Sequence, residues 1–124
     1  MFTIDPITND RTKIVIEAGW GLGEAIVGGM ITPDTYIINK KKNIIEDKNI
    51  SEQNMMIVRN RNGCKKIKVP KNITEKQKLE DKKILKLAKL CLNIEKHYKK
   101  PQDIEWAMEK GKIYIVQSRP ITTL

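Results

Sequence analysis

The sequence has few aromatic side chains, two cysteines and one histidine. Aromatic residues make up 5% of the chain and do not alternate with the basic residues in the pattern of base-stacking proteins. Cys64 and Cys91 have no metal-ligand spacing and define no disulfide framework. These shortages disfavour a cysteine-based metal site, a disulfide-stabilised scaffold and a stacking platform for single-stranded nucleic acid.

Long apolar runs are also missing. No stretch reaches the length of a membrane-spanning helix, and no signal peptide opens the chain. We therefore predict a cytoplasmic protein without a membrane partner, with both cysteines reduced. A chain of 124 residues has room for one modest core, so we expect one domain or less.

The charge is strongly basic, with a formal net charge of +9 and a pI near 9.6. Such a charge suits nucleic acid, because neutralising phosphates releases counterions. The lysines, however, are interleaved with acids and isoleucines over residues 40–48, 65–71 and 76–100. This pattern is more typical of a lysine-rich solvated surface, so nucleic acid is not the expected partner.

Short apolar runs predict strands in the first part of the chain. Lys13–Ala18 is the clearest, because it is a nearly continuous apolar run. Asn62-Gly63 is a typical two-residue hairpin turn. The later strands are expected at residues 35–39, 43–46, 55–59 and 65–69, with a charged turn at residues 40–43.

The glycine-rich segment Gly-Trp-Gly-Leu-Gly at residues 19–23 follows the first strand, and one helical turn is expected at residues 24–27. A turn of this kind can present main-chain N–H groups to an anion. Its spacing matches neither the dinucleotide-binding nor the P-loop motif. We therefore favour tight backbone packing around Trp20 over a phosphate cradle.

Residues 74–99 have the clearest helical pattern. Thr74 and Gln77 have the spacing of a capping box, and Pro101 ends the pattern. The only histidine, His97, falls in the last turn, an ordinary position for this residue, and we assign it no chemistry. The apolar stripe expected to pack on the sheet consists of Ile84, Leu87, Ala88, Cys91, Ile94 and Tyr98.

The C-terminal part reads as a β-hairpin, with strands at residues 103–108 and 112–118. We predict a three-residue loop, residues 109–111, closed by a left-handed glycine. This register places Glu105 opposite Ile115 and Asp103 opposite Gln117. A two-residue loop would instead place Glu105 and Gln117 on opposite faces.

Alternation along the predicted strands gathers polar groups on one face of the hairpin. Arg119 joins this face if the second strand continues to Pro120. Carboxylate and amide oxygens beside a guanidinium suit Mg²⁺ and polyphosphate, although a simply wetted polar face is an alternative that spacing leaves open. The predicted faces are Asp103, Glu105, Ala107, Ile113, Ile115 and Gln117 on the polar side, and Ile104, Trp106, Met108, Tyr114 and Val116 on an apolar side.

Both ends of the chain resemble the phosphoenolpyruvate synthase (pyruvate, water dikinase) family. The C-terminal part carries PQDIEWA, a glycine turn and IYIVQSRPITTL. The N-terminal part carries FTIDP, a strand ending in IEA, WGLGE, GG and TPD. The middle section matches only in outline. Pyruvate phosphate dikinase and rifampicin phosphotransferase share this domain.

The residues predict an α+β fold, a mainly antiparallel sheet with one long packing helix. The resemblance implies that residues 1–124 are the C-terminal portion of an ATP-grasp domain, whose two lobes close on ATP. It further implies ATP and Mg²⁺ as cofactors, with Glu105 and Gln117 as metal ligands and Arg119 as the catalytic phosphate contact. Asp103 lies in the same motif as a neighbour rather than a ligand.

The implied reaction converts ATP, pyruvate and water to phosphoenolpyruvate, AMP and phosphate through a phosphohistidine. The first lobe and the phosphohistidine and pyruvate domains are expected outside these residues, so we expect this portion alone to be inactive. Two alternatives stay open. One is a related ATP-grasp phosphotransferase, either a rifampicin phosphotransferase or a pyruvate phosphate dikinase. The other is a free-standing basic binding module.

Overall fold

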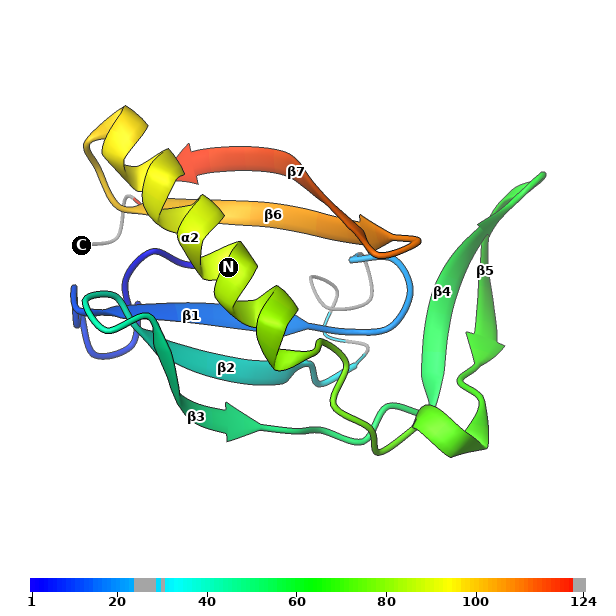
Figure 1. Cartoon of the computed structure of the whole chain (residues 1–124). Helices are drawn as coiled ribbons and strands as arrows, with labels where there is room; N and C mark the ends of the chain where they lie inside the picture. Colours follow the sequence, from blue (N-terminus) through cyan, green and yellow to red (C-terminus); the bar gives the residue numbers. More distant parts are fainter. Residues whose placement is uncertain (24–28, 30, 122–124) are drawn as a thin grey trace. The chain divides into compact units, whose positions relative to one another are not determined.

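The computed structural model describes residues 1–23, 29 and 31–121 (Figure 1). The helical turn predicted at residues 24–27 lies outside the described residues. Within the described part the elements are β1 Lys13–Ala18, β2 Asp34–Asn39, β3 Ile44–Asn49, β4 Met55–Asn60, β5 Gly63–Lys68, the 3₁₀ helix η1 Lys71–Ile73, α2 Asp81–Tyr98, β6 Gln102–Glu109 and β7 Lys112–Pro120.

Among the described residues, the strands form three sheets. β1, β2 and β3 are neighbours in that order, and β4–β5 and β6–β7 are separate two-stranded antiparallel hairpins. The prediction of an α+β fold with mostly antiparallel strands and one long helix is confirmed. The chain divides into two compact units: Met1–Ile16, Tyr36–Lys48 and Asp81–Leu124 in the first, and Glu17–Thr35 and Asn49–Glu80 in the second.

In the first unit, residues 1–3 form a short extended segment that pairs on both of its edges. The main-chain N–H of Phe2 donates to the carbonyl of Val15 in β1 at 2.8 Å, and the N–H of Val15 donates back at 3.0 Å. On the other edge, the N–H of Ile104 in β6 donates to the carbonyl of Met1 at 2.7 Å, and the Met1 nitrogen donates to the Ile104 carbonyl at 2.8 Å. The segment therefore joins β1 to β6.

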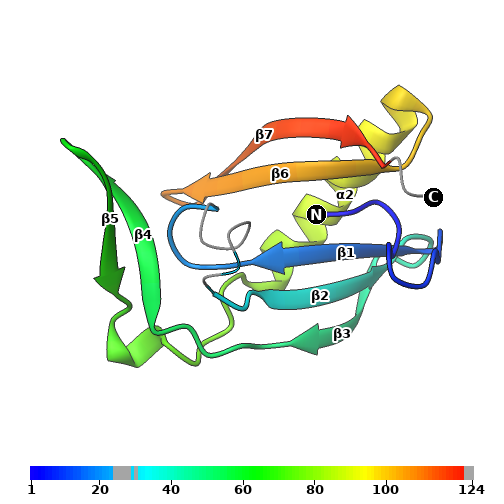
Figure 2. The same cartoon turned by 180° about the vertical axis from the view of Figure 1, so that it is seen from behind.

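The helix α2 packs against β6 and covers one side of the strands of the first unit, in front of them in Figure 1 and behind them in Figure 2. The predicted apolar stripe is confirmed for four of its six residues and is wrong for Tyr98. Ile94 is half-buried, and Tyr98 is exposed. The fully buried members are Ile84, Leu87, Ala88 and Cys91, which share the core with Ile14, Ile16, Tyr36, Ile38 and Ile104.

The predicted start of this helix at Thr74 is wrong, because α2 begins at Asp81. The capping box does not form. The Thr74 hydroxyl donates to the Lys71 carbonyl at 3.2 Å within the preceding turn, and the Gln77 amide donates to the Leu79 carbonyl at 2.7 Å. Side chains that form hydrogen bonds with their own local backbone compete with helix formation. Here these local bonds form in place of the capping box, and the helix begins later.

The helix ends at Tyr98, one residue before the predicted end at residue 99. Lys99 adopts a left-handed conformation, with φ of 57°, and its N–H donates to the Glu95 carbonyl at 2.7 Å. Such a left-handed residue satisfies a terminal carbonyl and stops the helix. Pro101 then follows, in agreement with its expected role as a breaker.

In the second unit, β4 and β5 form the predicted hairpin with a turn shifted by one residue. Asn60 is opposite Gly63, so the two loop residues are Arg61 and Asn62 rather than Asn62 and Gly63. The Asn60 side chain accepts a hydrogen bond from the Asn62 N–H at 3.0 Å. Cys64 consequently lies in a strand and is exposed.

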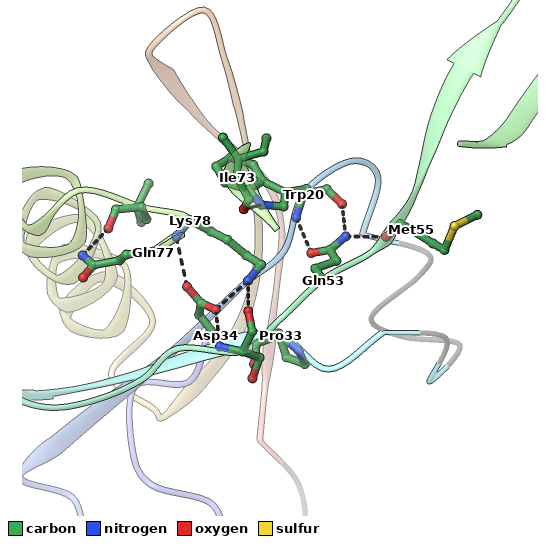
Figure 3. A network of polar contacts seen from close by, with 10 residues as sticks. Trp20, Pro33, Asp34, Gln53, Met55, Ile73, Gln77 and Lys78 are labelled. Carbon is green, nitrogen blue, oxygen red and sulfur yellow. Dashed lines mark hydrogen bonds and ion pairs between the residues drawn. The ribbon is translucent and has the colours of Figure 1, made fainter. Parts of the chain in front are cut away.

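The interpretation of the middle lysines as solvated is wrong for Lys78. Its ammonium lies 2.7 Å from Asp34 Oδ1 and donates to the Ser51 carbonyl at 2.7 Å (Figure 3). The Asp34 carboxylate also accepts from the N–H groups of Ser51 at 2.9 Å and Lys78 at 3.0 Å. Both side chains are almost fully buried, and the hydrogen bonds offset the cost of burying the charges.

Gly21 and Gly111 provide a matched pair for a stability prediction. Both have left-handed backbones, with φ of 82° and 78°. A Cβ on Gly21 would lie 2.6 Å from the Ile57 carbonyl oxygen and 2.9 Å from Met56 Cβ, whereas a Cβ on Gly111 meets nothing within 4 Å. Gly21→Ala should therefore lower the free energy of unfolding by about 2–5 kcal/mol, against about 1–2 kcal/mol for Gly111→Ala. Urea unfolding of both variants measures the difference, and equal losses would contradict the close approach.

Candidate functional site

The hairpin β6–β7 carries the candidate site, and its turn differs from the prediction. Glu109 is opposite Lys112, so the loop has two residues, Lys110 and Gly111, and the predicted three-residue loop is wrong. Both loop residues have positive φ, 51° and 78°. This is the backbone of a type I′ turn, which matches the twist of paired strands. Lys83 on α2 donates to the Gly111 carbonyl at 2.6 Å and supports the turn.

A β-bulge then changes the register a second time. From the turn to Trp106–Ile115 the pairing is regular, but the next pair is Glu105–Gln117, which leaves Val116 as the extra residue. The predicted pairs Glu105–Ile115 and Asp103–Gln117 are wrong. Without the bulge, the two-residue loop would have placed Val116 opposite Glu105, and Gln117 would have moved to the other face.

The bulge therefore brings the predicted polar residues together by a route the sequence did not indicate. Glu105 is directly opposite Gln117, and Asp103 is directly opposite Arg119. Directly paired side chains project from the same face, with Cβ atoms roughly 5 Å apart. All four predicted residues thus share one face at the end of the hairpin remote from the turn.

The assignment of the apolar residues to the two faces needs correction. Tyr114 is opposite Ala107 and so lies on the polar face, whereas Ile113 and Ile115 are opposite Met108 and Trp106 on the other face. That other face is only partly core. Ile104 is fully buried, but Met108 and Ile115 remain 40% and 38% exposed.

Within the polar face the guanidinium has a defined partner. Arg119 Nε and Nη2 lie 3.3 and 3.2 Å from Asp103 Oδ2. Asp103 is itself held through its backbone, which forms a bridge with Phe2. Glu105 and Gln117 are exposed, so their oxygens are accessible to a ligand.

This donor set fits a divalent cation that is shared with phosphate. Mg²⁺ is commonly bound by one or two protein carboxylates together with substrate phosphates and waters. Glu105 supplies one carboxylate and Gln117 one amide oxygen. No cluster of three or more His, Cys, Asp or Glu side chains suited to a metal ion occurs within residues 1–23, 29 and 31–121. The chain thus offers a partial ligand set rather than a complete cage.

The glycine-rich turn packs against its own chain around Trp20, as predicted. The Trp20 N–H donates to Gln53 Oε1 at 2.8 Å, and the Leu22 N–H donates to the Ile57 carbonyl at 2.8 Å. The indole N–H of Trp20 donates to the Ile73 carbonyl at 3.2 Å. These N–H groups are therefore already bonded within the chain.

Gln53 was missed by the sequence reasoning. It is 2% exposed, and its Nε2 donates to the carbonyls of Trp20 and Met55 at 2.9 and 2.8 Å (Figure 3). No local signal marks this residue, because its partner Trp20 lies far away in the sequence. The same holds for Asp34, which entered the sequence analysis only as the last residue of the TPD motif but which anchors Lys78.

The remaining candidates have ordinary environments. His97 is exposed and its ring packs edge-on against Tyr98, with centroids 4.8 Å apart. Its lack of a chemical role stays a prediction. Both cysteines are free, and burial raises the pKa of the Cys91 thiol to about 12. Among the described residues, no helix is long and apolar enough to cross a membrane.

Comparison with known proteins agrees with the sequence motifs. The family model described as pyruvate phosphate dikinase, AMP/ATP-binding domain, matches residues 1–124. The whole chain is 54% identical to 10% of a probable phosphoenolpyruvate synthase of Methanocaldococcus jannaschii, and 50% identical to 16% of the phosphoenolpyruvate synthase of Pyrococcus furiosus. It is also 42% identical to 14% of a rifampicin phosphotransferase of Bacillus subtilis. The chain thus spans a small part of the length of each relative.

The corrected register predicts which engineered cysteines can pair. In a Cys64→Ser background, Glu105→Cys with Gln117→Cys should form a disulfide under mild oxidation, because directly opposite Cα atoms lie within disulfide range. Glu105→Cys with Ile115→Cys, the pair of the rejected register, should stay reduced, since Ile115 is opposite Trp106. Mass spectrometry of the oxidised proteins distinguishes the two, and the reverse result would refute the bulge.

Proposed function

Because the chain belongs to the family of pyruvate phosphate dikinase AMP/ATP-binding domains, we propose that Glu105, Gln117 and Arg119 form the metal- and phosphate-binding part of a nucleotide site. The observation that carries this proposal is the pairing of Glu105 with Gln117 beside Asp103 and Arg119 on one exposed face. Glu105, Gln117 and Arg119 thereby come together from two strands with their polar atoms accessible.

Each residue has a distinct role in the proposal. Glu105 and Gln117 offer a charged and a neutral oxygen to Mg²⁺, and Arg119 contacts phosphate oxygens through its planar guanidinium. When Mg²⁺ is bound, the chemistry it supplies is neutralisation of charge on the phosphate oxygens. The hairpin's share is positional, because its paired backbone fixes the spacing between the oxygen ligands and the guanidinium.

In the parent enzyme, we propose, this face belongs to the C-terminal portion of an ATP-grasp domain. The α+β structure with an antiparallel hairpin carrying acidic and amide residues is compatible with that architecture. The first lobe and the phosphohistidine and pyruvate domains would be supplied by other parts of the protein. A cytoplasmic location belongs to the same proposal.

For the overall reaction we propose phosphoenolpyruvate synthesis from ATP, pyruvate and water, with AMP and phosphate as the other products and a phosphohistidine intermediate. The identities favour this over phosphorylation of rifampicin, since the synthases match at 54% and 50% and the rifampicin enzyme at 42%. The acceptor is chosen outside the hairpin, so rifampicin phosphotransfer is the second candidate. Assaying the intact protein with pyruvate and with rifampicin separates the two.

The proposed ligand roles predict a graded kinetic response in the intact protein. Glu105→Gln should lower kcat/KM for ATP-dependent AMP formation by about 100-fold, because metal-ion charge stabilisation is worth several kcal/mol. Gln117→Ala and Arg119→Lys should each cost about tenfold, since a neutral oxygen and a forked contact are worth less. Steady-state assays over ATP and Mg²⁺ concentrations measure these losses.

Glu109→Gln is the matched control, because Glu109 is also an exposed carboxylate of β6 but lies next to the turn. It should retain the parent activity. All four variants should unfold at the same urea concentration as the parent within error, since the altered side chains are exposed. Full activity in Glu105→Gln would refute the proposed metal role.

A further inference from the structure

Arg119 has two carboxylates within reach on its face of the hairpin. Asp103 is directly opposite it, and Glu105 occupies the diagonal position two residues further along β6. Diagonal neighbours on an antiparallel pair lie roughly 7–8 Å apart, which a long side chain can span. In the described structure the guanidinium binds Asp103, at 3.2 and 3.3 Å, and forms no ion pair with Glu105.

The two members of this ion pair are held to different degrees. The Asp103 side chain is 23% exposed, and its backbone is fixed by the bridge to Phe2. The Arg119 side chain is 65% exposed, so fewer contacts within the chain hold it in place. Asp103 is thus the better-anchored member of the pair, and its carboxylate is the partner that the guanidinium contacts.

The position of the guanidinium matters for Glu105. A hard cation depends on the negative charge of its carboxylate ligand, and an arginine bound to that carboxylate would neutralise it and occupy its oxygens. Binding of Arg119 to Asp103 leaves the Glu105 oxygens open. It also keeps the arginine beside the site, where a phosphate can recruit it.

We propose that Asp103 is a positioning residue that holds Arg119 away from Glu105 and thereby keeps the Glu105 carboxylate available to a divalent cation. Asp103 acts through Arg119 and is not a metal ligand. This inference rests on the proposed role of Glu105 as a ligand.

A double-mutant cycle tests the inference in the intact protein. Mn²⁺ replaces Mg²⁺ as a spectroscopic probe, and its binding is titrated by electron paramagnetic resonance without nucleotide, because a bound phosphate would itself hold Arg119. Asp103→Asn should weaken Mn²⁺ binding by about two- to fivefold, the range expected when an exposed ion pair forms at a competing position. In an Arg119→Gln background the same Asp103→Asn change should have no effect.

Two further variants complete the design. Asp103→Glu keeps a carboxylate for Arg119 and should retain the parent affinity, which excludes a purely structural loss. Glu109→Gln removes another exposed carboxylate of the same strand and should leave Mn²⁺ binding unchanged.

A ligand role for Asp103 gives the opposite pattern. Equal weakening by Asp103→Asn with Arg119 present and with Arg119→Gln would overturn the inference, as would no weakening in either background. Glu105→Gln separates this failure from failure of the proposed function. Unchanged Mn²⁺ binding in Glu105→Gln refutes the ligand assignment itself, whereas weakened binding there without the predicted coupling refutes only the role of Asp103.

Discussion

Main-chain pairing of residues 1–3 is the interaction on which the first unit depends. This segment bonds β1 through Phe2 and Val15 and bonds β6 through Met1 and Ile104. A two-stranded hairpin is marginally stable by itself, so β6–β7 needs this edge and its contact with α2 to hold a fixed position. The hydrogen bonds come from backbone groups, so they fix the strand without restricting which side chains it carries.

The pairing also explains why the polar residues sit where they do. In β6, burial falls from Gln102 and Ile104, which are buried, toward the turn, where every residue is exposed. The end of the hairpin that residues 1–3 bind is the end that carries Asp103 and Glu105. The candidate site therefore lies on the better-supported part of a strand pair, with Thr3 accepting a further hydrogen bond from the Gln102 N–H at 2.8 Å.

Features encoded by local patterns were predictable from the sequence. β1 was predicted at its observed bounds because its apolar run is nearly continuous, and the buried stripe of α2 followed from helical spacing. The turn of β6–β7 was not predictable from glycine alone, since it needs Lys110 in a left-handed conformation that few non-glycine residues adopt. The bulge at Val116 has no signature in a single strand, because it is a property of two strands paired together.

The candidate site, too, combines features that local sequence patterns encode with features that depend on how two strands pair. The residue types on the hairpin indicated metal and phosphate chemistry, but the spacing alone gave the wrong pairs, and the individual roles came from the family resemblance. The start of α2 was missed because Thr74 and Gln77 bond locally. The Asp34–Lys78 ion pair joins residues 44 positions apart, a separation at which one sequence carries no pairing signal.

Two carboxylates of the chain, Asp34 and Glu105, illustrate opposite uses of this group. Asp34 is buried and receives hydrogen bonds from two N–H groups and an ammonium, so its oxygens are committed to holding the second unit together. Glu105 is exposed, which keeps its desolvation cost small and its oxygens open. One carboxylate and one amide oxygen bind a divalent cation only weakly, because most of its coordination must come from elsewhere. In the proposed site, phosphate oxygens therefore add most of the affinity, and the metal should bind more tightly together with the nucleotide than as the free ion.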